Sequence, residues 1–556
     1  MCGIAGIFHL ETAKPVDPTR LRKMTDSLAH RGPDGSGIWT APGVGLGHRR
    51  LSIIDLEGGA QPMLTADEAQ ILSFNGEIYN FQDVRAELEG LGHQFETSSD
   101  SEVILYSWRQ WGVDCLKRLN GMFAFALYDQ RNRTLFLARD RLGVKPLFYA
   151  PVSDGSILFA SELKGLLANP LLRREPSLRA VDDYLAFGYV PDQTSLLRGV
   201  KKLPAGHYLL LEQGKPEPAA VQYWDMDFSQ RHRASASALE EELVDLLKQA
   251  VGLRMVADVP LGAFLSGGVD SSAVVALMAE TSRRPVKTCS IGFDQQSLDE
   301  TGYARQVAER FRTDHRKRIV AADDFGLIDT LADHFDEPFA DASALPTYRV
   351  CELARETVTV ALSGDGADEA MAGYRRHVFH QAEERVRGLL PQSFRGPAFG
   401  WLGSVYPKAD WAPRPFRAKS TLLSLARTGP EGYAEAVGVT TPGRRRLIYS
   451  DAMQRDLGDY QAEQRMIDLM ERAPARNGLD QAQYADMKMW LPGDILTKVD
   501  RTSMAVGLEA REPLLDYRLM EFAAKLPASL RVHRGQGKYL LKKSMERYLP
   551  HDILYR

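Results

Sequence analysis

The sequence predicts two differently built halves, an α+β domain rich in antiparallel sheet and then an α/β domain with a doubly wound parallel sheet. Up to about Gly206, short apolar or alternating runs are separated by Gly, Pro and Asp turns. From Ala263 onward, strand-like and helix-like segments alternate, and after Gly373 the pattern becomes largely helical. Layered antiparallel sheet is typical of the first pattern, and a parallel sheet with helices on both faces of the second.

Composition excludes several classes of partner. The chain has 556 residues, 44% hydrophobic and 26% charged, with a net charge of −4. A chain of this length is too long to fold around a single hydrophobic core. Its near-neutral net charge argues against nucleic acid or an anionic membrane as the main partner. Small metabolites are therefore the expected ligands.

The cysteines and the N-terminus indicate a cytoplasmic protein. Cys2, Cys115, Cys289 and Cys351 lie far apart and form no C-x-x-C pair. A disulfide framework is therefore not expected, and a reducing compartment fits best. The sequence has no apolar run of about 18 residues and no signal-peptide pattern at its start, so no membrane partner is expected.

In the first half, predicted as a domain over residues 2–206, strand-like runs alternate with helical patterns. Apolar and β-branched runs bounded by turn residues indicate strands, and apolar residues spaced three and four apart indicate helices. The predicted strands are 71–74, 122–128, 134–138 and 157–160, and the predicted helices are 83–91 and 101–111.

Residues 207–236 are predicted to connect this domain to a second one over residues 237–556. The segment is polar and contains Pro216 and Pro218, which is typical of an inter-domain connection. In the second domain, ligands are expected where parallel strands end. The predicted strands there are 263–265, 286–293, 316–320 and 357–362, and the predicted helices are 271–280, 303–311 and 347–356.

Cys2 is a candidate nucleophile. Removal of Met1 would give one residue both a thiol and a free α-amino group, whose pKa is roughly 8. Such a residue carries its own base. The alternative is a small buried apolar residue at the edge of a strand.

The segment 74–80 contains groups that an N-terminal thiol would need. The Asn75 amide and the Gly76 N–H, which no Cβ obstructs, are candidate donors to a developing oxyanion. Glu77, Asp100 and Arg50 are of the right chemical types to hold the charged groups of an amino acid. Taken singly, Asn75-Gly76 is also typical of a hairpin turn, Asp100 of a helix cap and Arg50 of a surface cation.

A glycine-rich turn over residues 266–272 follows a predicted strand and precedes a predicted helix. Two glycines, three serine hydroxyls and a helix N-terminus favour phosphate binding, although the Walker spacing is absent. Asp270 within the turn suggests a metal ion that bridges to phosphate oxygens. The alternative is a generic strand-to-helix turn.

A second turn, over residues 363–369, brings Asp365, Asp368 and Glu369 together. Such close carboxylates repel one another unless cations share the site. Asp368 is the second candidate for magnesium, and Asp365 is a candidate general base or substrate-positioning group. The alternative, an acidic helix start favoured by the helix dipole, would account for Asp368 and Glu369.

The first half closely resembles the class II glutamine amidotransferase domain of glutamine-hydrolysing asparagine synthetases. The motifs that carry the resemblance are residues 2–6, 31–34, 50–53, 74–80 and 139–147. The resemblance implies an N-terminal-nucleophile hydrolase sandwich with two sheets between helices. It also implies that Cys2 attacks glutamine, that Asn75 and Gly76 form the oxyanion hole, and that Arg50, Asn75, Gly76, Glu77 and Asp100 bind glutamine.

The second half is similar to the ATP pyrophosphatase domain of the same synthetases. The two turns carry this resemblance, together with residues 499–501, 503–505, 507–511 and 513–516. It implies that Asp270 and Asp368 hold Mg²⁺. The implied ATP-binding residues are Leu265, Ser266, Gly267, Gly268, Val269, Asp270, Ser271, Ser272, Ile291, Ser363 and Gly364.

Three departures from the family pattern concern the synthetase site. Asp365 stands where many members have Glu, and residues 370–373 differ from the usual run while Tyr374, a candidate catalytic residue, is kept. The printed sequence ends at Arg556, whereas in the family a lysine follows this run within a residue or two. Lys538 is the remaining basic candidate for the pyrophosphate side.

The resulting hypothesis is a glutamine-dependent asparagine synthetase. Glutamine would yield ammonia at Cys2, ATP would convert aspartate to β-aspartyl-AMP, and enclosed ammonia would attack it. One alternative is an amidotransferase for another carboxylate, such as a sugar acid or a cell-surface polymer precursor. Another is a nucleotide-binding relative without activity; relatives that close β-lactam rings lack the N-terminal cysteine. A homodimer is an open expectation.

Overall fold

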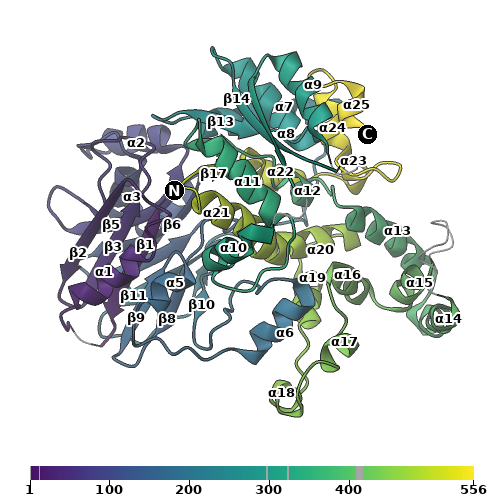
Figure 1. Cartoon of the computed structure of the whole chain (residues 1–556), viewed down its shortest axis with the longest axis horizontal. Helices are drawn as coiled ribbons and strands as arrows, with labels where there is room; N and C mark the ends of the chain where they lie inside the picture. The colour runs from purple at the N-terminus through teal and green to yellow at the C-terminus, as the bar shows by residue number, and fades with distance from the viewer. Residues whose placement is uncertain (1, 12, 296–298, 322–324, 408–417) are drawn as a thin grey trace.

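The computed structural model describes residues 2–556 except 12, 296–298, 322–324 and 408–417. Its first half is an N-terminal-nucleophile hydrolase sandwich with two antiparallel sheets between helices (Figure 1), as predicted. The first sheet has the order β10 (Lys201–Lys202), β8 (Phe148–Pro151), β9 (Ser156–Ala160), β1 (Gly3–His9), β3 (Val44–Arg50), β2 (Gly35–Ala41). The second has the order β12 (Val221–Gln222), β11 (His207–Glu212), β7 (Thr134–Arg139), β6 (Gly121–Asp129), β5 (Gln70–Ile78), β4 (Met63–Leu64).

Strand β1 shows why the sandwich has four layers. Its residues alternate between two cores because successive strand side chains point to opposite faces. Ile4 and Phe8 pack against the second sheet, whereas Ala5 and Ile7 pack against helices. The helices of this half are α1 (Pro18–Asp26), α2 (Phe81–Gly90), α3 (Asp100–Trp111), α4 (Cys115–Arg118), α5 (Leu163–Leu167) and α6 (Leu178–Phe187), with a short 3₁₀ turn η1 (Gly112–Asp114).

The segment predicted as a connection differs from the prediction in its first part. Residues 207–222 contain β11 and β12, which pair with each other and, through β11, with β7. Leu209 and Leu211 are fully buried between the sheets, so buried residues alternate in this segment as they do in a β-strand, although its composition is polar. Residues 223–235 carry no helix or strand, and α7 (Ala236–Arg254) follows.

The second half contains the predicted parallel sheet. Its strand order is β15 (Asp314–Val320), β14 (Lys287–Phe293), β13 (Leu261–Phe264), β16 (Val360–Leu362), β17 (Glu509–Arg511). Val360 and Leu362 face the core under α7 and α8 (Val269–Thr281), while Ala361 faces α11 (Ala344–Arg355). The order reverses between β13 and β16, and the crevice outside such a reversal is where α/β sheets bind ligands.

The chain after Gly373 is largely helical, as predicted, and its helices between Arg375 and Leu457 spread away from the parallel sheet in Figure 1. No helix in the described part of the chain is long and apolar enough to cross a bilayer. The remaining elements are α9 (Thr301–Phe311), η2 (Phe325–Leu327), α10 (Ile328–Phe335), α12 (Ala367–Ala370), α13 (Arg375–Leu389), α14 (Gln392–Val405), α15 (Lys419–Ala426), α16 (Gly429–Val437), α17 (Pro442–Arg446), α18 (Asp451–Leu457), α19 (Glu463–Arg472), α20 (Gly478–Ala485), a π-helix η4 (Asp486–Ile495), α21 (Leu496–Met504), η5 (Pro513–Leu515), α22 (Tyr517–Ala524), α23 (Ala528–Arg531), α24 (Tyr539–Met545) and α25 (His551–Leu554).

Buried ion pairs join the two halves. The Arg31 guanidinium, fully buried, donates to both oxygens of Asp500 at 2.8 Å and to Glu162 at 2.6 Å. Arg501 forms a second ion pair with Glu162, at 2.6 Å. Buried charges are tolerated only when paired, so these contacts fix how the sandwich sits against α21.

Replacing Asp500 with alanine should therefore destabilise the protein strongly. Removing one partner of a buried pair leaves the opposite charge uncompensated, which costs about 3–5 kcal/mol. Urea denaturation measures this loss. The control is Glu280→Ala, which removes the exposed pair with Lys248 and should cost less than about 1 kcal/mol. Equal losses in the two variants would contradict the role given to Arg31 and Asp500.

Candidate active site

Cys2 lies between the two sheets at the start of β1. Its backbone N–H donates to Asn75 Oδ1 at 2.9 Å, and its Sγ lies 3.9 Å from the Leu51 carbonyl oxygen. The residue is 7% exposed, and this burial raises the pKa of the Cys2 thiol. A buried thiol of raised pKa needs a base to take its proton when it attacks.

Asn75 and Gly76, on the facing strand β5, can stabilise negative charge beside this thiol. With Oδ1 occupied by Cys2, Asn75 Nδ2 is buried and has no partner among the described residues. Gly76 has φ +150°, and a Cβ there would lie 2.0 Å from the Met122 carbonyl oxygen. Only glycine fits this position. A buried donor without a partner is the feature expected of an oxyanion hole.

Two of the three predicted amino-acid-binding residues, Glu77 and Asp100, are buried. Glu77 forms an ion pair with Arg511 at 3.2 Å, and Asp100 accepts from the Ile78 N–H at 2.9 Å. Burial raises the pKa of Asp100 to about 6 and that of Glu77 well above its usual range. Arg50 is half-buried and donates to the carbonyls of Leu56 and Asp55, so its guanidinium supports that loop.

The predicted phosphate turn lies at the crevice between β13 and β16. Gly268 precedes the first turn of α8, and Gly267 has φ +76° and lies so close to Ala304 that a Cβ would be 2.5 Å from its nitrogen. The Ser266 and Ser271 hydroxyls are 3.0 Å apart. Ser272 Oγ is buried without a partner in the described chain. The turn thus presents free donors at a helix N-terminus, where anions bind.

The second predicted turn packs directly against the first. A Cβ on Gly364 would lie 2.7 Å from the Ser271 nitrogen, so the two backbones touch. Ser363 Oγ donates to Asp365. Leu265 is buried, Ile291 on the neighbouring strand β14 and Val269 are half-buried, and all three flank the crevice.

Lys538 connects the two predicted magnesium ligands. Its Nζ lies 2.6 Å from Asp270 and 2.7 Å from Asp368. Burial raises the pKa of Asp270 to about 6, although Lys538 opposes the shift, and Asp270 Oδ1 has no partner in the described residues. The cation that these crowded carboxylates require is a lysine from a distant segment.

Tyr374 lies next to this cluster. Its hydroxyl donates to Glu369 at 2.6 Å and accepts from Trp490 Nε1 at 3.2 Å. Burial raises the pKa of Glu369 to about 8. Tyr374 therefore holds a carboxyl group that is protonated near neutral pH, rather than pointing into the open crevice.

Family models match both halves of the chain. A model for asparagine synthase matches residues 242–556, and one for a glutamine amidotransferase domain matches residues 1–224. The chain belongs to the asparagine synthase family.

Relatives that match nearly the whole chain are named as asparagine synthetases or as an amidase. Two glutamine-hydrolysing asparagine synthetases of Bacillus subtilis strain 168, numbered 1 and 3, are 33% and 32% identical, each over 100% of this chain and 86% of the relative. Amidase chry2 of Gibberella zeae is 28% identical over 96% of this chain and 83% of its own length. This asparagine synthase family member is therefore an ATP-dependent ligase that uses glutamine as its amide donor.

Sequence reasoning assigned no role to several charged residues that complete the enzyme's sites. Arg31, whose Nε donates to the Cys2 carbonyl at 3.0 Å, and Arg511 both lie within family motifs. Lys498 pairs with Asp341 at 2.7 Å beside the acidic turn. The motifs were visible, but the partners of these residues lie far away in sequence, so only the fold identifies them.

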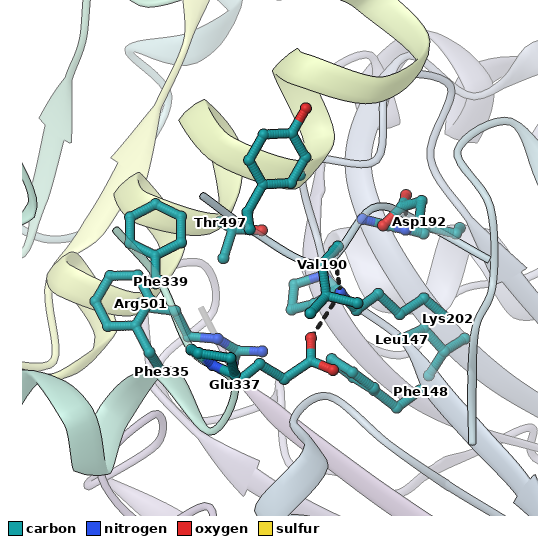
Figure 2. Close-up of a pocket in the computed structure, with 15 residues that line it drawn as sticks. Leu147, Phe148, Val190, Asp192, Lys202, Phe335, Glu337, Phe339, Thr497 and Arg501 are labelled. Atoms are coloured by element: carbon teal, nitrogen blue, oxygen red, sulfur yellow. Dashed lines mark hydrogen bonds and ion pairs between the residues drawn. The ribbon is translucent and has the colours of Figure 1, made fainter. Parts of the chain in front are cut away.

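A pocket of about 30 Å³ lies between the two halves of the enzyme (Figure 2). Figure 2 shows Leu147, Phe148 and Val190 of the first half opposite Phe335 and Phe339 of the second. Its polar wall contains a Lys202–Glu337 ion pair at 2.6 Å. At this place the interface between the two halves is stabilised partly by an ion pair, and the side chains leave a small pocket between them.

The Asn75→Ala variant should lose glutaminase activity. Losing one oxyanion donor costs roughly 10²–10³ in kcat, and this change also removes the acceptor of the Cys2 N–H. Steady-state glutamate release measures the effect. Ammonia-dependent synthesis is the internal control, and a parallel loss there would contradict a role confined to glutamine hydrolysis.

Glu369 should make stability depend on pH. Because its folded pKa of about 8 lies above the ordinary 4.5, its contribution is fully present below about pH 4.5 and is lost as the pH rises through 8. Glu369→Gln removes this titration. Thermal unfolding should therefore show the melting temperature of the variant rising relative to that of the wild type as the pH increases from about 5 to about 8. Parallel pH curves for the two proteins would exclude this contribution, and Glu280→Gln serves as the exposed control.

Proposed function

We propose that this enzyme is a glutamine-dependent asparagine synthetase whose two sites share an interior path for ammonia. The observation that carries the proposal is Arg511, which contacts both sites. Its carbonyl accepts from the Ser363 N–H at 2.8 Å, at the start of the acidic turn, and its guanidinium pairs with Glu77 at 3.2 Å, beside Cys2. A residue shared by the two sites supports transfer of nitrogen within the molecule.

In the first site, Cys2 would attack the side-chain amide of glutamine once Met1 is removed. The α-amino group of Cys2 would take the thiol proton and return it to the departing ammonia. Asn75 Nδ2 and the Gly76 N–H would stabilise the tetrahedral oxyanion. Arg50, Glu77 and Asp100 are proposed to hold the charged end of glutamine.

In the second site, ATP would activate aspartate. A carboxylate is a poor electrophile because its charge is delocalised, and adenylation gives it AMP as a leaving group. The turn of residues 266–272 would bind pyrophosphate, and Leu265 and Ile291 would contact the adenosine. Ser363 and Gly364 would line the nucleotide. The acceptor carboxylate would lie near Asp365 and Tyr374. Burial of the acyl-AMP would keep water from hydrolysing it.

Asp270 and Asp368 are proposed to hold Mg²⁺ with the phosphates. Their carboxylate oxygens are the hard donors that this ion prefers, and the unpaired Asp270 Oδ1 leaves one donor available. When bound, the ion would neutralise phosphate oxygens. Lys538, already between these carboxylates, would hold the pyrophosphate side.

A second candidate is an amidotransferase that acts on another small carboxylate. Asp365 is one methylene shorter than the glutamate found at this position in many family members, which alters the acceptor side of the crevice. A relative that is similar over 96% of this chain is named an amidase rather than an asparagine synthetase. Pocket contacts, rather than fold, decide between acids of similar size.

The Cys2→Ala variant separates the two half-reactions. We expect it to lose glutamine-dependent amide formation, because the nucleophile is gone, and to keep ammonia-dependent synthesis. ATP–pyrophosphate exchange that depends on aspartate should be unchanged in the variant. If the wild type shows ATP–pyrophosphate exchange with another acid and none with aspartate, asparagine synthesis is wrong and amidation of that other acid takes its place.

A further inference from the structure

A small cavity lies between the two sites. Its volume of about 20 Å³ has room for one water-sized molecule. On one side it is lined by Gly121 and Met122 of β6, and on the other by Glu512 and Leu515, which follow β17.

Each wall of the cavity touches one site. Met122 pairs with Glu77 across the second sheet, and its carbonyl lies against Gly76 of the oxyanion hole. Leu515 lies against Gly366 of the acidic turn, where a Cβ would be 2.2 Å from Leu515 Cδ2. A molecule that moves from Cys2 to the acidic turn would therefore find its next space here.

The arginines and the aspartate of the cavity wall already have partners. Asp140 accepts four backbone N–H groups, at 2.9–3.2 Å. Arg141 donates to the carbonyls of residues 116, 117 and 119, and Arg254 pairs with Asp516 at 3.0 Å. Both oxygens of Asp140 are therefore occupied, whereas Arg141 Nε, Arg254 Nε and the Tyr79 hydroxyl remain buried donors without a partner in the described chain.

Glu512 differs from Asp140, the other carboxyl group on this wall, in having no hydrogen-bond donor from the described residues on its oxygens. It is 3% exposed, and in the described part of the chain its carboxyl group makes no hydrogen bond or ion pair. A buried carboxyl without a partner costs free energy, so its presence on a cavity wall indicates a ligand that can hydrogen-bond to it. The cavity admits only something the size of water or ammonia.

Charges of both signs surround Glu512. The Lys145 ammonium and the Arg254 guanidinium favour its ionised form, whereas Asp365 and Glu509 oppose it; Tyr79, Asp140, Arg141 and Tyr517 line the same cavity. Burial is the largest effect and raises the pKa of Glu512 to about 7. A group with such a pKa can take and release a proton at neutral pH.

We propose that Glu512 takes a proton from ammonium in this cavity and so delivers neutral ammonia to the acyl-AMP. Ammonia released at Cys2 becomes ammonium when it takes a proton from water, leaving hydroxide. In the cavity one N–H bond of that ammonium breaks and one O–H bond forms on the Glu512 carboxylate, which leaves ammonia with the lone pair that attack requires. The Glu512 carboxylate is regenerated when its proton passes to water as the products leave. This inference rests on the proposed transfer of ammonia between the sites.

The test is Glu512→Gln, which keeps the shape and cannot accept the proton. Glutamate release and acid-dependent ATP–pyrophosphate exchange should stay at wild-type rates. Amide formed per glutamine hydrolysed should fall by roughly tenfold or more at neutral pH. It should recover as the pH rises, because more of the nitrogen is then unprotonated. Glu512→Asp should keep much of the yield and the wild-type pH profile.

A wild-type amide yield and pH profile in Glu512→Gln would overturn the proposal. So would a yield that falls equally at every pH, or an equal fall in exchange, since a merely structural role predicts both. If the wild type itself forms no amide from any acid tested, the proposed function fails instead, before the variant is compared.

Discussion

The pairing of buried charges between the two halves is the constraint on which the rest of the structure depends. Arg31 leaves water completely and is compensated by Glu162 from its own half and Asp500 from the other. The same guanidinium donates to the Cys2 carbonyl, so the residue that holds the nucleophile is itself paired with Asp500 of the synthetase half. Because an unpaired buried charge is so costly, the two halves have one favourable arrangement, and that arrangement brings both sites to a common interior.

The same rule separates supporting residues from residues available for chemistry. Arg511 pairs with Glu509 of its own strand and with the distant Glu77. Lys538 pairs with Asp270 and Asp368, which are both distant from it in sequence. Asn75 Nδ2 and Asp270 Oδ1 are two of the buried polar atoms that have no partner among the described residues. These atoms lie beside Cys2 and in the phosphate crevice, where the proposed reaction would supply a partner.

Much of the fold followed from local patterns. The predicted strands and helices of both halves exist, because alternation and helical spacing report burial directly. The segment 207–222 was misassigned since its prolines and charged residues resemble a connection, yet Leu209 and Leu211 alternate as a buried strand. Within the candidate site, Cys2 and Asn75 form the expected neighbours. Arg50 also donates to the carbonyls of Leu56 and Asp55, contacts that no motif describes, and its role toward glutamine stays a prediction.

The sequence by itself determined the two architectures, the family motifs and the residue types at each site, because these depend on short segments whose chemistry is local. Tertiary structure decided which charges meet. Glu512 lies between two family motifs, residues 507–511 and 513–516, and nothing in that run assigns it a role. Its buried position, its lack of a partner in the described chain and its place between the two sites arise only when β6 and the end of β17 face each other. Electrostatic environment depends on every group nearby in space, and most of those groups are hundreds of residues apart.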